Sequence, residues 1–501
     1  MKSGEMNPTL RDIRQSAQRR APLFEALERH VAREPLSFHV PGHRGGEQFD
    51  ATGKRYFGSL LPIDLTELNG LDDLHQPQGA IAEAQQLAAE VFGAEETFFL
   101  VGGSTAGNLA MVLAACQPGD KLLVGRDAHR SVFHACMLAG VKVVLLPARV
   151  HPEFAIPCGV DPATVRQALS RHPDARAVLL TNPNYYGMGK HLAAIAGEVH
   201  AYGIPLLVDE AHGAHFAFHP SLPPTALSAG ADGVVQSAHK TLPALTMGAF
   251  LHLQGSRLSR WKVRQALAML QSSSPSYPVL ASLDLARRWM FCEGRGRLER
   301  LFHAAGRFQE WLRRRGWKVP EGADAFYDWT DPLRLLLHHP EVSGYQVAKR
   351  LEAAAVYPEL ADPLQVVCVV TAANREEDLD RLKVLLSYFV RHSAEQGKTE
   401  PAATVLAAQL AARWQAVYEE SQLDAMELDQ SWMHREREEV PWSEAGGRRS
   451  ASMVVPYPPG IPLLLPGEVI RDCHLALLDI YHKLGAHVQG LLSGELSVLC
   501  E

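Results

Sequence analysis

Three absences bound what this 501-residue chain can be: paired cysteines, an excess of basic residues and long apolar runs. Its seven cysteines include no C-x-x-C pair, which argues against both a zinc ribbon and a disulfide framework. The net charge of -7 leaves no basic excess to neutralise phosphates, so we expect no nucleic-acid partner. No apolar run approaches the roughly 18 residues that span a bilayer, and the polar amino terminus carries no targeting pattern. We therefore expect no membrane partner and a cytoplasmic location.

A P-loop is also missing, which matters because residues 209–212 read DEAH, the letters of a helicase motif. An ATP-driven helicase needs the pattern G-x-x-x-x-G-K-[ST] after a strand, where backbone amides surround the phosphates. The only G-K-T of the chain stands at 397–399 in a polar stretch, and His392 occupies the place of the leading glycine. The sequence therefore argues against an NTPase.

The segment around DEAH is also a candidate metal site. Four closely spaced donors are found there: Asp209, His212, His215 and His219. Their spacing does not match H-E-x-x-H, and Pro220 ends any helix that would align the histidines. We therefore expect no metal, and we interpret the histidines as packing or capping residues near a site.

What the chain does contain is an alternation of short apolar runs with helical patterns from Glu90 to His252. This rhythm predicts an α/β domain with a largely parallel sheet. Before this domain, the helical spacing of apolar residues in Pro22–Val31 predicts an amphipathic arm. After it, a long helical pattern at 282–316 and a strand pattern at Pro363–Thr371 predict a smaller α/β unit. We divide the chain into an N-terminal helical arm (1–36), a large domain (37–300), a small α/β domain (301–396) and a C-terminal domain (397–501), with a polar linker near 391–403.

One strand-to-helix turn has the features of an anion site. The run TFFLV ends in Gly102-Gly103, and Ser104 and Thr105 then open a helix. Glycines permit the tight turn, the helix amino terminus offers free N–H groups and a positive dipole, and the hydroxyls add donors. A capped turn without any ligand has the same pattern, so this segment alone leaves both interpretations open.

Two further strand ends carry an aspartate and a lysine. Asp209 follows the run IPLLV, and Ser237, His239 and Lys240 follow the run GVVQ. Ligands of parallel sheets bind beyond the carboxyl ends of the strands. Together with the anion site, these residues suggest pyridoxal 5′-phosphate, with its ring nitrogen at Asp209 and its aldehyde at Lys240. The residues alone do not separate a decarboxylase from an aminotransferase, and a noncatalytic regulator on the same fold also stays open.

The chain resembles the pyridoxal-phosphate-dependent Orn/Lys/Arg decarboxylase family along nearly its whole length. The resemblance rests on motifs that follow one another in the family's order: FHVPGHRGG (38–46), DLTELNGLDDLHQPQGAI (64–81), FFLVGGSTAGN (98–108), RDAHRS (126–131), VDEAHGAHF (208–216), QSAHKTL (236–242), SSSPSYPVLASLD (272–284) and YPPGIPLLLPGE (457–468). It implies the aspartate-aminotransferase fold (fold type I), with a large, mostly parallel α/β domain, a smaller α/β domain and a C-terminal α+β domain.

The resemblance also implies roles for individual residues. Lys240 binds the cofactor aldehyde, Asp209 keeps the pyridine nitrogen protonated, and His129 stacks on the ring. The implied cofactor-binding set is Gly103, Ser104, Thr105, His129, Asp209, Ala211, His212, Ser237, His239 and Lys240. Glu359, in YPELAD, matches an acidic segment near the family's substrate pocket. Two positions depart from the pattern: His212 stands where some larger members carry tryptophan, and VGGST has a glycine where relatives often show asparagine.

The activity implied by the resemblance is decarboxylation of a basic amino acid, which releases CO2 and an amine. Arginine, giving agmatine, is preferred because the length resembles the compact bacterial branch without the receiver-like wing domain. Lysine, giving cadaverine, and ornithine, giving putrescine, remain alternatives. The family also implies a homodimer or a higher homo-oligomer.

Overall fold

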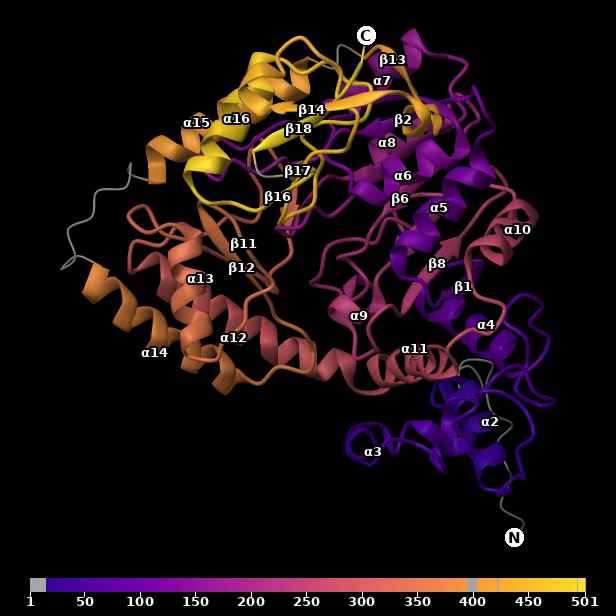
Figure 1. Ribbon diagram of the computed structural model, residues 1–501. Helices are drawn as coiled ribbons and strands as arrows, with labels where there is room; N and C mark the ends of the chain where they lie inside the picture. The colour runs from indigo at the N-terminus through magenta and orange to yellow at the C-terminus, as the bar shows by residue number, and fades with distance from the viewer. Residues whose placement is uncertain (1–14, 394–402, 421–422, 493, 501) are drawn as a thin grey trace.

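The computed structural model describes residues 15–393, 403–420, 423–492 and 494–500. Its main element is an eight-stranded sheet with the order β1-β8-β7-β6-β4-β2-β3-β13 (Figure 1). The strands are β1 (Glu96–Leu100), β2 (Lys121–Gly125), β3 (Val141–Leu146), β4 (Ala177–Thr181), β6 (Leu206–Asp209), β7 (Gly233–Gln236), β8 (Ala249–Leu253) and β13 (Ala425–Leu428). Parallel pairing joins β3, β2, β4, β6 and β7, whereas β8 and β13 pair antiparallel with their neighbours.

The central strands read as continuous apolar runs because both faces of the sheet are covered. In β3, for example, Val143 and Leu145 pack in one core cluster and Val144 and Leu146 in the other. One face is covered by α5 (Gly103–Ala115), α6 (Arg130–Ala139) and α10 (Arg260–Leu270). The other face is covered by α4 (Ala80–Phe92), α7 (Pro162–Arg171), α8 (Leu192–His200) and α11 (Tyr277–Trp289). The predicted α/β domain with a mostly parallel sheet is therefore present.

A smaller α/β unit follows the long helical segment of α11, η4 (Met290–Gly294) and α12 (Arg295–Arg313). Its three-stranded antiparallel sheet has the order β10-β12-β11. The elements are β10 (Arg334–His338), α13 (Gly344–Ala353), β11 (Leu360–Ala361), β12 (Gln365–Val369) and α14 (Glu376–Ser393). The predicted linker falls partly on residues 394–402, which include the G-K-T at 397–399 and lie outside the described residues.

The carboxyl-terminal part packs around its own apolar cluster, to which Ala148 and Val150 of the large domain also belong. Its elements are α15 (Ala403–Glu419), β14 (Arg437–Pro441), β15 (Val455–Pro456), α16 (Asp472–Lys483), β16 (Val488–Gln489), β17 (Leu491–Leu492) and β18 (Glu495–Leu499). Its first strand, β13, pairs with β3 and so extends the large sheet. The remaining short elements are α9 (Ala238–Thr241), β5 (Met188–Gly189), β9 (Trp329–Thr330), η1 (Arg44–Gly46), η2 (Leu61–Ile63), η3 (Phe216–Phe218), η5 (Ser431–His434) and η6 (Trp442–Glu444).

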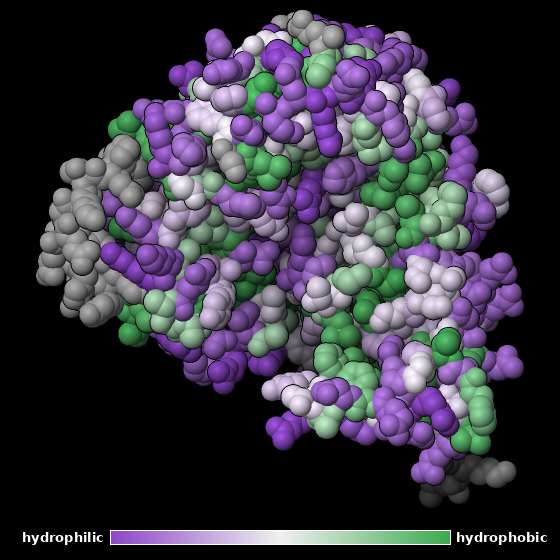
Figure 2. Space-filling model, viewed as in Figure 1, coloured by the Kyte–Doolittle hydropathy of each residue, from purple (hydrophilic) through white to green (hydrophobic). Residues whose placement is uncertain are grey.

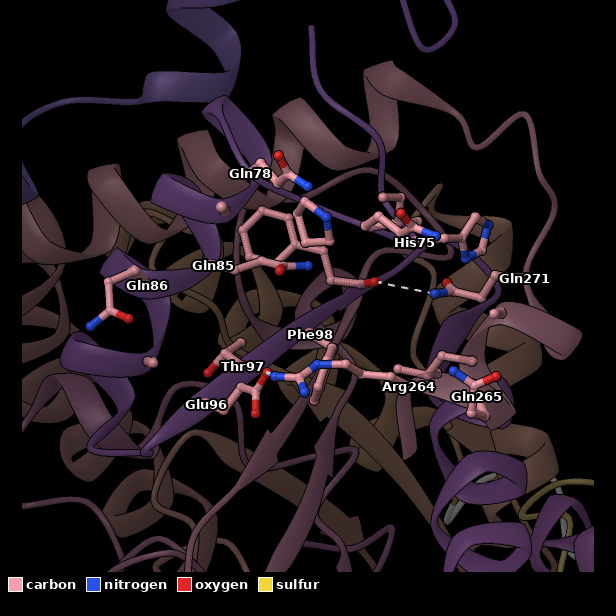
Figure 3. A pocket seen from close by; sticks show the side chains of 18 residues that line it. His75, Gln78, Gln85, Gln86, Glu96, Thr97, Phe98, Arg264, Gln265 and Gln271 are labelled. Carbon is pink, nitrogen blue, oxygen red and sulfur yellow. Dashed lines mark hydrogen bonds and ion pairs between the residues drawn. The ribbon is translucent and has the colours of Figure 1, made fainter. Parts of the chain in front are cut away.

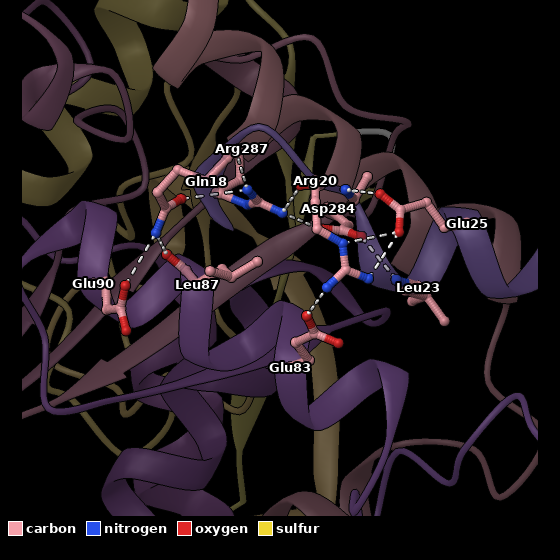
Figure 4. A network of polar contacts seen from close by, with 10 residues as sticks. Gln18, Arg20, Leu23, Glu25, Glu83, Leu87, Glu90, Asp284 and Arg287 are labelled. Atoms are coloured by element: carbon pink, nitrogen blue, oxygen red, sulfur yellow. Dashed lines mark hydrogen bonds and ion pairs between the residues drawn. The ribbon is translucent and has the colours of Figure 1, made fainter. Parts of the chain in front are cut away.

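The N-terminal arm docks on the large domain through α2 (Pro22–Val31), whose Leu23 and Leu27 are fully buried. Beneath it lies a network of buried charges (Figure 4). Arg287 Nη1 donates to the Gln18 carbonyl oxygen at 2.7 Å, and Nη2 donates to the Arg20 carbonyl oxygen at 2.8 Å and also pairs with Asp284. The Leu23 amide donates to Asp284 at 3.0 Å. Backbone and side chains of the arm thus complete a buried ion pair of α11.

The segment after α2 projects from the body of the molecule and ends in α3 (Ala51–Phe57) (Figure 1). Large apolar side chains are exposed along it, including Phe38 at 90% and Tyr56 at 81%. Hydrophobic surface is visible over the same lower part of the molecule in Figure 2. None of the helices in the described part of the chain combines the length and the apolar character needed to cross a membrane.

Candidate active site

Asp209 is the last residue of β6 and is buried at the carboxyl end of the large sheet. Asn108 Nδ2, from α5, donates to Asp209 Oδ2 at 2.9 Å, and the Ala211 amide donates to Oδ1 at 3.1 Å. Burial raises the pKa of Asp209, and the Asn108 donor and the positive charge of Lys240 act against that increase. The carboxylate is thus held in a fixed position by one donor from α5 and one from the turn after β6.

Lys240 lies in the short helix α9, directly after β7. Its Nζ is 3.1 Å from His212 Nε2 and 5.8 Å from the centre of the Tyr185 ring. Burial lowers the pKa of Lys240; the charge of Asp209 opposes this, while that of Arg334 adds to it. An amine with a lowered pKa beside a buried carboxylate is suited to attack an aldehyde.

The predicted anion site lies at the start of α5. Gly103 has a φ of +71°, in the left-handed region, and its amide donates to the Met247 carbonyl oxygen at 2.9 Å. The Ser237 hydroxyl donates to the Ser104 hydroxyl at 2.9 Å, which joins the strand end of β7 to the first turn of α5. Thr105 is exposed on that turn. The Gly103 amide and the Ser237 hydroxyl proton are therefore already used within the protein, whereas the first-turn amides that follow Gly103 suit an anion.

His239 also faces this region. Its backbone amide donates to the Gly248 carbonyl oxygen at 3.2 Å, and its Nδ1 is 3.1 Å from the same oxygen. A carbonyl oxygen only accepts, so Nδ1 carries the proton. Burial lowers the pKa of His239, so the ring is neutral with an unprotonated Nε2.

His129 caps the amino end of α6 and belongs to the same hydrogen-bond network as Asp209. Its Nδ1 is 2.8 Å from the Ser131 hydroxyl, which in turn accepts from Asn108 Nδ2 at 3.0 Å. Burial, together with the positive charge of Lys240, lowers the pKa of His129 to about 3. His129 is therefore neutral at ordinary pH. The carboxyl-terminal part reaches the site here, because a β-carbon added at Gly460 would lie 3.7 Å from His129 Cδ2.

Three residues of the site escaped the sequence analysis: Asn108, Tyr185 and Arg334. The Tyr185 ring lies between two predicted residues, 4.9 Å from the His212 ring and 6.4 Å from the His129 ring. Arg334, only 4% exposed, directs Nη2 at His212 Nδ1 over 3.1 Å, and its Nε and Nη1 have no hydrogen-bond partner in the described part of the chain. Asn108 lies within the quoted motif FFLVGGSTAGN, which was the signal available for it.

Glu359 stands at the edge of the site, just before β11. Its amide donates to the Val367 carbonyl oxygen at 2.9 Å, and its side chain is exposed. Its negative charge raises the pKa of both Lys240 and Arg334, against the larger lowering caused by their burial. Glu359 is thus an exposed carboxylate within electrostatic reach of the buried cations.

The histidines that follow DEAH pair with carboxylates in different places. His215 Nε2 is 3.1 Å from Asp331, and His219 Nε2 is 2.7 Å from Glu299. Among the described residues, no group of three or more His, Cys, Asp or Glu side chains could hold a metal ion.

A cavity of about 590 Å³ lies away from these residues, beside β1, α4 and α10 (Figure 3). Its lining mixes apolar side chains with polar ones, which include Gln78, Gln85, Gln86, Gln265, Gln271, His75 and Thr97. Arg264 crosses it to pair with Glu96. No residue of the predicted site lines this cavity.

Comparison with known proteins agrees with this fold and places the chain in a family. The family model described as "Orn/Lys/Arg decarboxylase, major domain" matches residues 21–333, and that of the C-terminal domain matches 408–491. The uncharacterized protein YaaO of Bacillus subtilis is 42% identical over 474 residues, 94% of this chain and 96% of YaaO. The arginine decarboxylase of Bacillus subtilis is 35% identical over 484 residues, 95% of this chain and 96% of that enzyme.

Among solved structures, the lysine decarboxylase LdcF of Francisella novicida superposes with a TM-score of 0.80 at 21% identity, over 95% of this chain and 80% of that chain. Together with the mostly parallel sheet, this likeness confirms the predicted aspartate-aminotransferase-like fold class. The chain belongs to the Orn/Lys/Arg decarboxylase family.

Proposed function

We propose that this chain is a pyridoxal 5′-phosphate-dependent decarboxylase of a basic amino acid, with arginine as the preferred substrate. The observation that carries the proposal is that the Lys240 amine lies within electrostatic reach of the fixed Asp209 carboxylate, after neighbouring strands, in a member of this family. The preference for arginine is supported by the relatives named arginine decarboxylase, which are 33–36% identical over at least 90% of the chain.

The residues of the site fit the cofactor. The first turn of α5, with Ser104 and Ser237, suits its phosphate; Thr105 and His239 lie at the edge of the same region. Asp209 is buried with a single side-chain donor, so the N–H of a protonated pyridine would offset the cost of burying its charge. When bound, pyridoxal 5′-phosphate supplies the electron sink that accepts the electrons of the breaking carbon–carboxylate bond.

The chain's own residues orient and protect this chemistry. Asn108 and the Ala211 amide hold Asp209 so that its carboxylate keeps a proton on the pyridine nitrogen. His129 is neutral and fixed through Nδ1 by Ser131, so it offers an uncharged ring face for stacking. The buried surroundings of these groups exclude water, which strengthens each electrostatic contact.

Glu359 is the proposed residue for the cationic end of the substrate. Its exposed carboxylate lies within electrostatic reach of Lys240 and Arg334, at the edge of the site. A guanidinium or an ammonium group would gain a charge-assisted hydrogen bond there. The Glu359→Gln variant should raise KM for arginine more than it lowers kcat, because this contact is made before and during the reaction.

The active form is a homodimer or a higher homo-oligomer. The exposed apolar side chains of residues 36–57 support this, since large exposed apolar patches mark interaction sites. Sizing chromatography with activity measured across the peak tests it, and activity in a monomer peak would contradict it.

The test of the function is to supply the purified protein with pyridoxal 5′-phosphate and, separately, with arginine, lysine and ornithine. We expect CO2 and one amine in equal amounts, with agmatine formed fastest. The Lys240→Ala variant is the control and should release neither. A keto acid in place of CO2 would indicate an aminotransferase, and absence of any reaction with bound cofactor would indicate a regulator.

A further inference from the structure

His212 lies between two nitrogen-bearing side chains that come from different parts of the fold. Its Nδ1 is 3.1 Å from Arg334 Nη2, and its Nε2 is 3.1 Å from Lys240 Nζ. Arg334 belongs to β10 of the small sheet, whereas His212 and Lys240 follow strands of the large sheet. These contacts therefore link the small sheet to the amine proposed to bind the cofactor.

The donors and acceptors of this link can be assigned. A guanidinium only donates, so His212 Nδ1 must be the acceptor and cannot carry a proton. Burial, with the charges of Lys240 and Arg334, holds the pKa of His212 well below its ordinary value, so the ring is neutral. A neutral imidazole has one proton, which must then be on Nε2. Nε2–H faces Lys240 Nζ, and only an unprotonated amine has the lone pair to accept it.

The opposite assignment is less favourable. A protonated Lys240 would direct N–H at Nε2–H, so two donors would meet and one buried hydrogen bond would be lost. The charged and titratable groups that influence or contact Lys240 come from several elements: Asp209 at the end of β6, His212 after it, Arg334 in β10, Glu359 before β11, His129 at the start of α6, His239 in α9 and Tyr185 after β4. Among these, Asp209 and Glu359 favour the protonated amine, and the His212 contact acts against them.

We propose that Arg334 is a positioning residue that fixes the tautomer of His212, so that His212 Nε2–H holds the Lys240 amine in its unprotonated, reactive form. This inference rests on the proposed role of Lys240 in binding the cofactor. In this proposal Arg334 fixes the tautomer through its contact with His212, and its positive charge separately lowers the pKa of Lys240. His212 would thus have a specific task at a position where some larger members of the family carry tryptophan.

The test measures covalent capture of pyridoxal 5′-phosphate by the full-length chain freed of cofactor, as a function of pH. In this step Nζ bonds to the aldehyde carbon and one water is released, and borohydride then makes the bond permanent for mass spectrometry. The initial rate follows the unprotonated fraction of Lys240, so the pH at half-maximal rate reports the state of the amine. We expect this midpoint in the wild type to lie below that of free lysine.

Two matched variants of His212 test the donor. In His212→Gln the amide nitrogen can occupy the place of Nε2 and still donate to Lys240, whereas the side chain in His212→Asn is too short. We expect the midpoint to rise by about one pH unit in His212→Asn, as the loss of one hydrogen bond predicts, and by much less in His212→Gln. Equal midpoints in the wild type and both variants would overturn the proposal.

The tautomer itself tests Arg334. Nitrogen NMR of protein with 15N-labelled histidine, with His212→Gln used to assign the signal, should show the proton of His212 on Nε2. In Arg334→Met the signal should move toward a mixture of tautomers, and Arg334→Lys, which keeps a donor, should restore part of the preference. An unchanged tautomer of His212 in Arg334→Met would overturn the proposed role of Arg334. Any shift in the pH midpoint of cofactor capture would then come from the loss of the Arg334 charge alone.

The Lys240→Ala variant separates this inference from the proposed function. If that variant still captures the cofactor at the same site, the proposed function fails. If it captures none, and the His212 variants leave the pH profile unchanged, the proposed function stands and only the role of His212 and Arg334 fails.

Discussion

Two groups of buried charges, one beneath the N-terminal arm and one at the ends of β6 and β7, use similar residue types differently. Beneath the arm, both terminal nitrogens of Arg287 are engaged, by the Gln18 and Arg20 carbonyl oxygens and by Asp284 (Figure 4). At the site, Arg334 makes one side-chain hydrogen bond, to His212, and its Nε and Nη1 have no partner in the described residues. Among the described residues, Arg287 thus leaves only its Nε without a partner, whereas Arg334 leaves both Nε and Nη1 without one.

The number of hydrogen-bond partners that a buried charge has indicates whether it contributes mainly to stability or to function. A buried charge whose partners are complete has no capacity for a ligand, and removing one partner leaves the other charge uncompensated. A buried charge with free donors or a shifted pKa is costly to the fold and is typical of functional sites. Variants beneath the arm should therefore change the free energy of unfolding, and variants at the site should change activity.

The largest effect is expected from Lys240→Ala at the site. Loss of the amine should lower CO2 release by roughly four orders of magnitude or more, since no other side chain replaces it, and should abolish covalent cofactor. The melting temperature of the cofactor-free protein should change little. A variant that released CO2 at the wild-type rate would contradict the assignment of the site.

Asp284→Ala should instead lower stability and leave activity nearly unchanged. It leaves the Arg287 charge buried without its carboxylate, which should lower the free energy of unfolding by about 3–5 kcal/mol. Urea unfolding measures the loss, and the double variant Asp284→Leu with Arg287→Met, which removes both charges, should recover most of it. Activity per folded molecule should stay near that of the wild type, and a loss of activity without a loss of stability would break the comparison.

Asp209→Asn should retain the cofactor but lower kcat by about 10²–10³-fold, because an amide does not stabilise a protonated pyridine nitrogen. The neighbouring Glu210→Gln is the matched control. Burial raises the pKa of Glu210 to about 8, so its carboxyl group is mostly protonated at neutral pH and glutamine matches its lack of charge. Steady-state kinetics should therefore show little change in Glu210→Gln, and equal losses in both variants would contradict the special role of Asp209.

The site should also respond to acid through His129. Its pKa is lowered to about 3 by burial, against about 6.5 in an unfolded chain, so between these values only the unfolded state takes up the proton. Stability contributed by the neutral histidine is complete above pH 6.5 and falls as the pH decreases, by up to about 1.4 kcal/mol per pH unit. Urea unfolding between pH 6.5 and 4.5 should show a shallower decline in His129→Gln. Parallel declines in the two proteins would contradict the shift.

The smallest effect is expected at the exposed edge of the arm network. Arg20 pairs with Glu83 there, and their side chains are 48% and 46% exposed. Glu83→Gln should therefore change the free energy of unfolding by less than about 1 kcal/mol. A loss as large as that of Asp284→Ala would show that the edge and the centre of the network act as one unit.

Much of this architecture could be predicted from the sequence. The apolar runs from TFFLV to GAFLHL correspond to strands of the large sheet, because strands buried on both faces require continuous apolar residues. Asp209 and Lys240 could be expected to meet, because the carboxyl ends of parallel strands lie at one edge of a sheet. The cofactor roles assigned to these residues, and the division of the chain at 36, 300 and 396, stay predictions.

The rest depended on contacts that no local pattern reveals. Arg334 reaches His212 from another sheet, and nothing in the run DPLRLLL distinguishes it from a surface arginine. The strand β13 reads AMEL, which is too short and too mixed to predict, and its place is set by pairing with β3. Long-range pairing of this kind is decided by tertiary packing.

The position of β13 has a consequence for how the protein is made. Because residues 425–428 supply the outermost strand beside β3, the large sheet is complete only after most of the chain has left the ribosome. Until then β3 presents an open edge, and open edges can template aggregation. A shortened chain that ends before residue 425 would keep that edge open permanently, so expression of the isolated large domain should yield an aggregation-prone product.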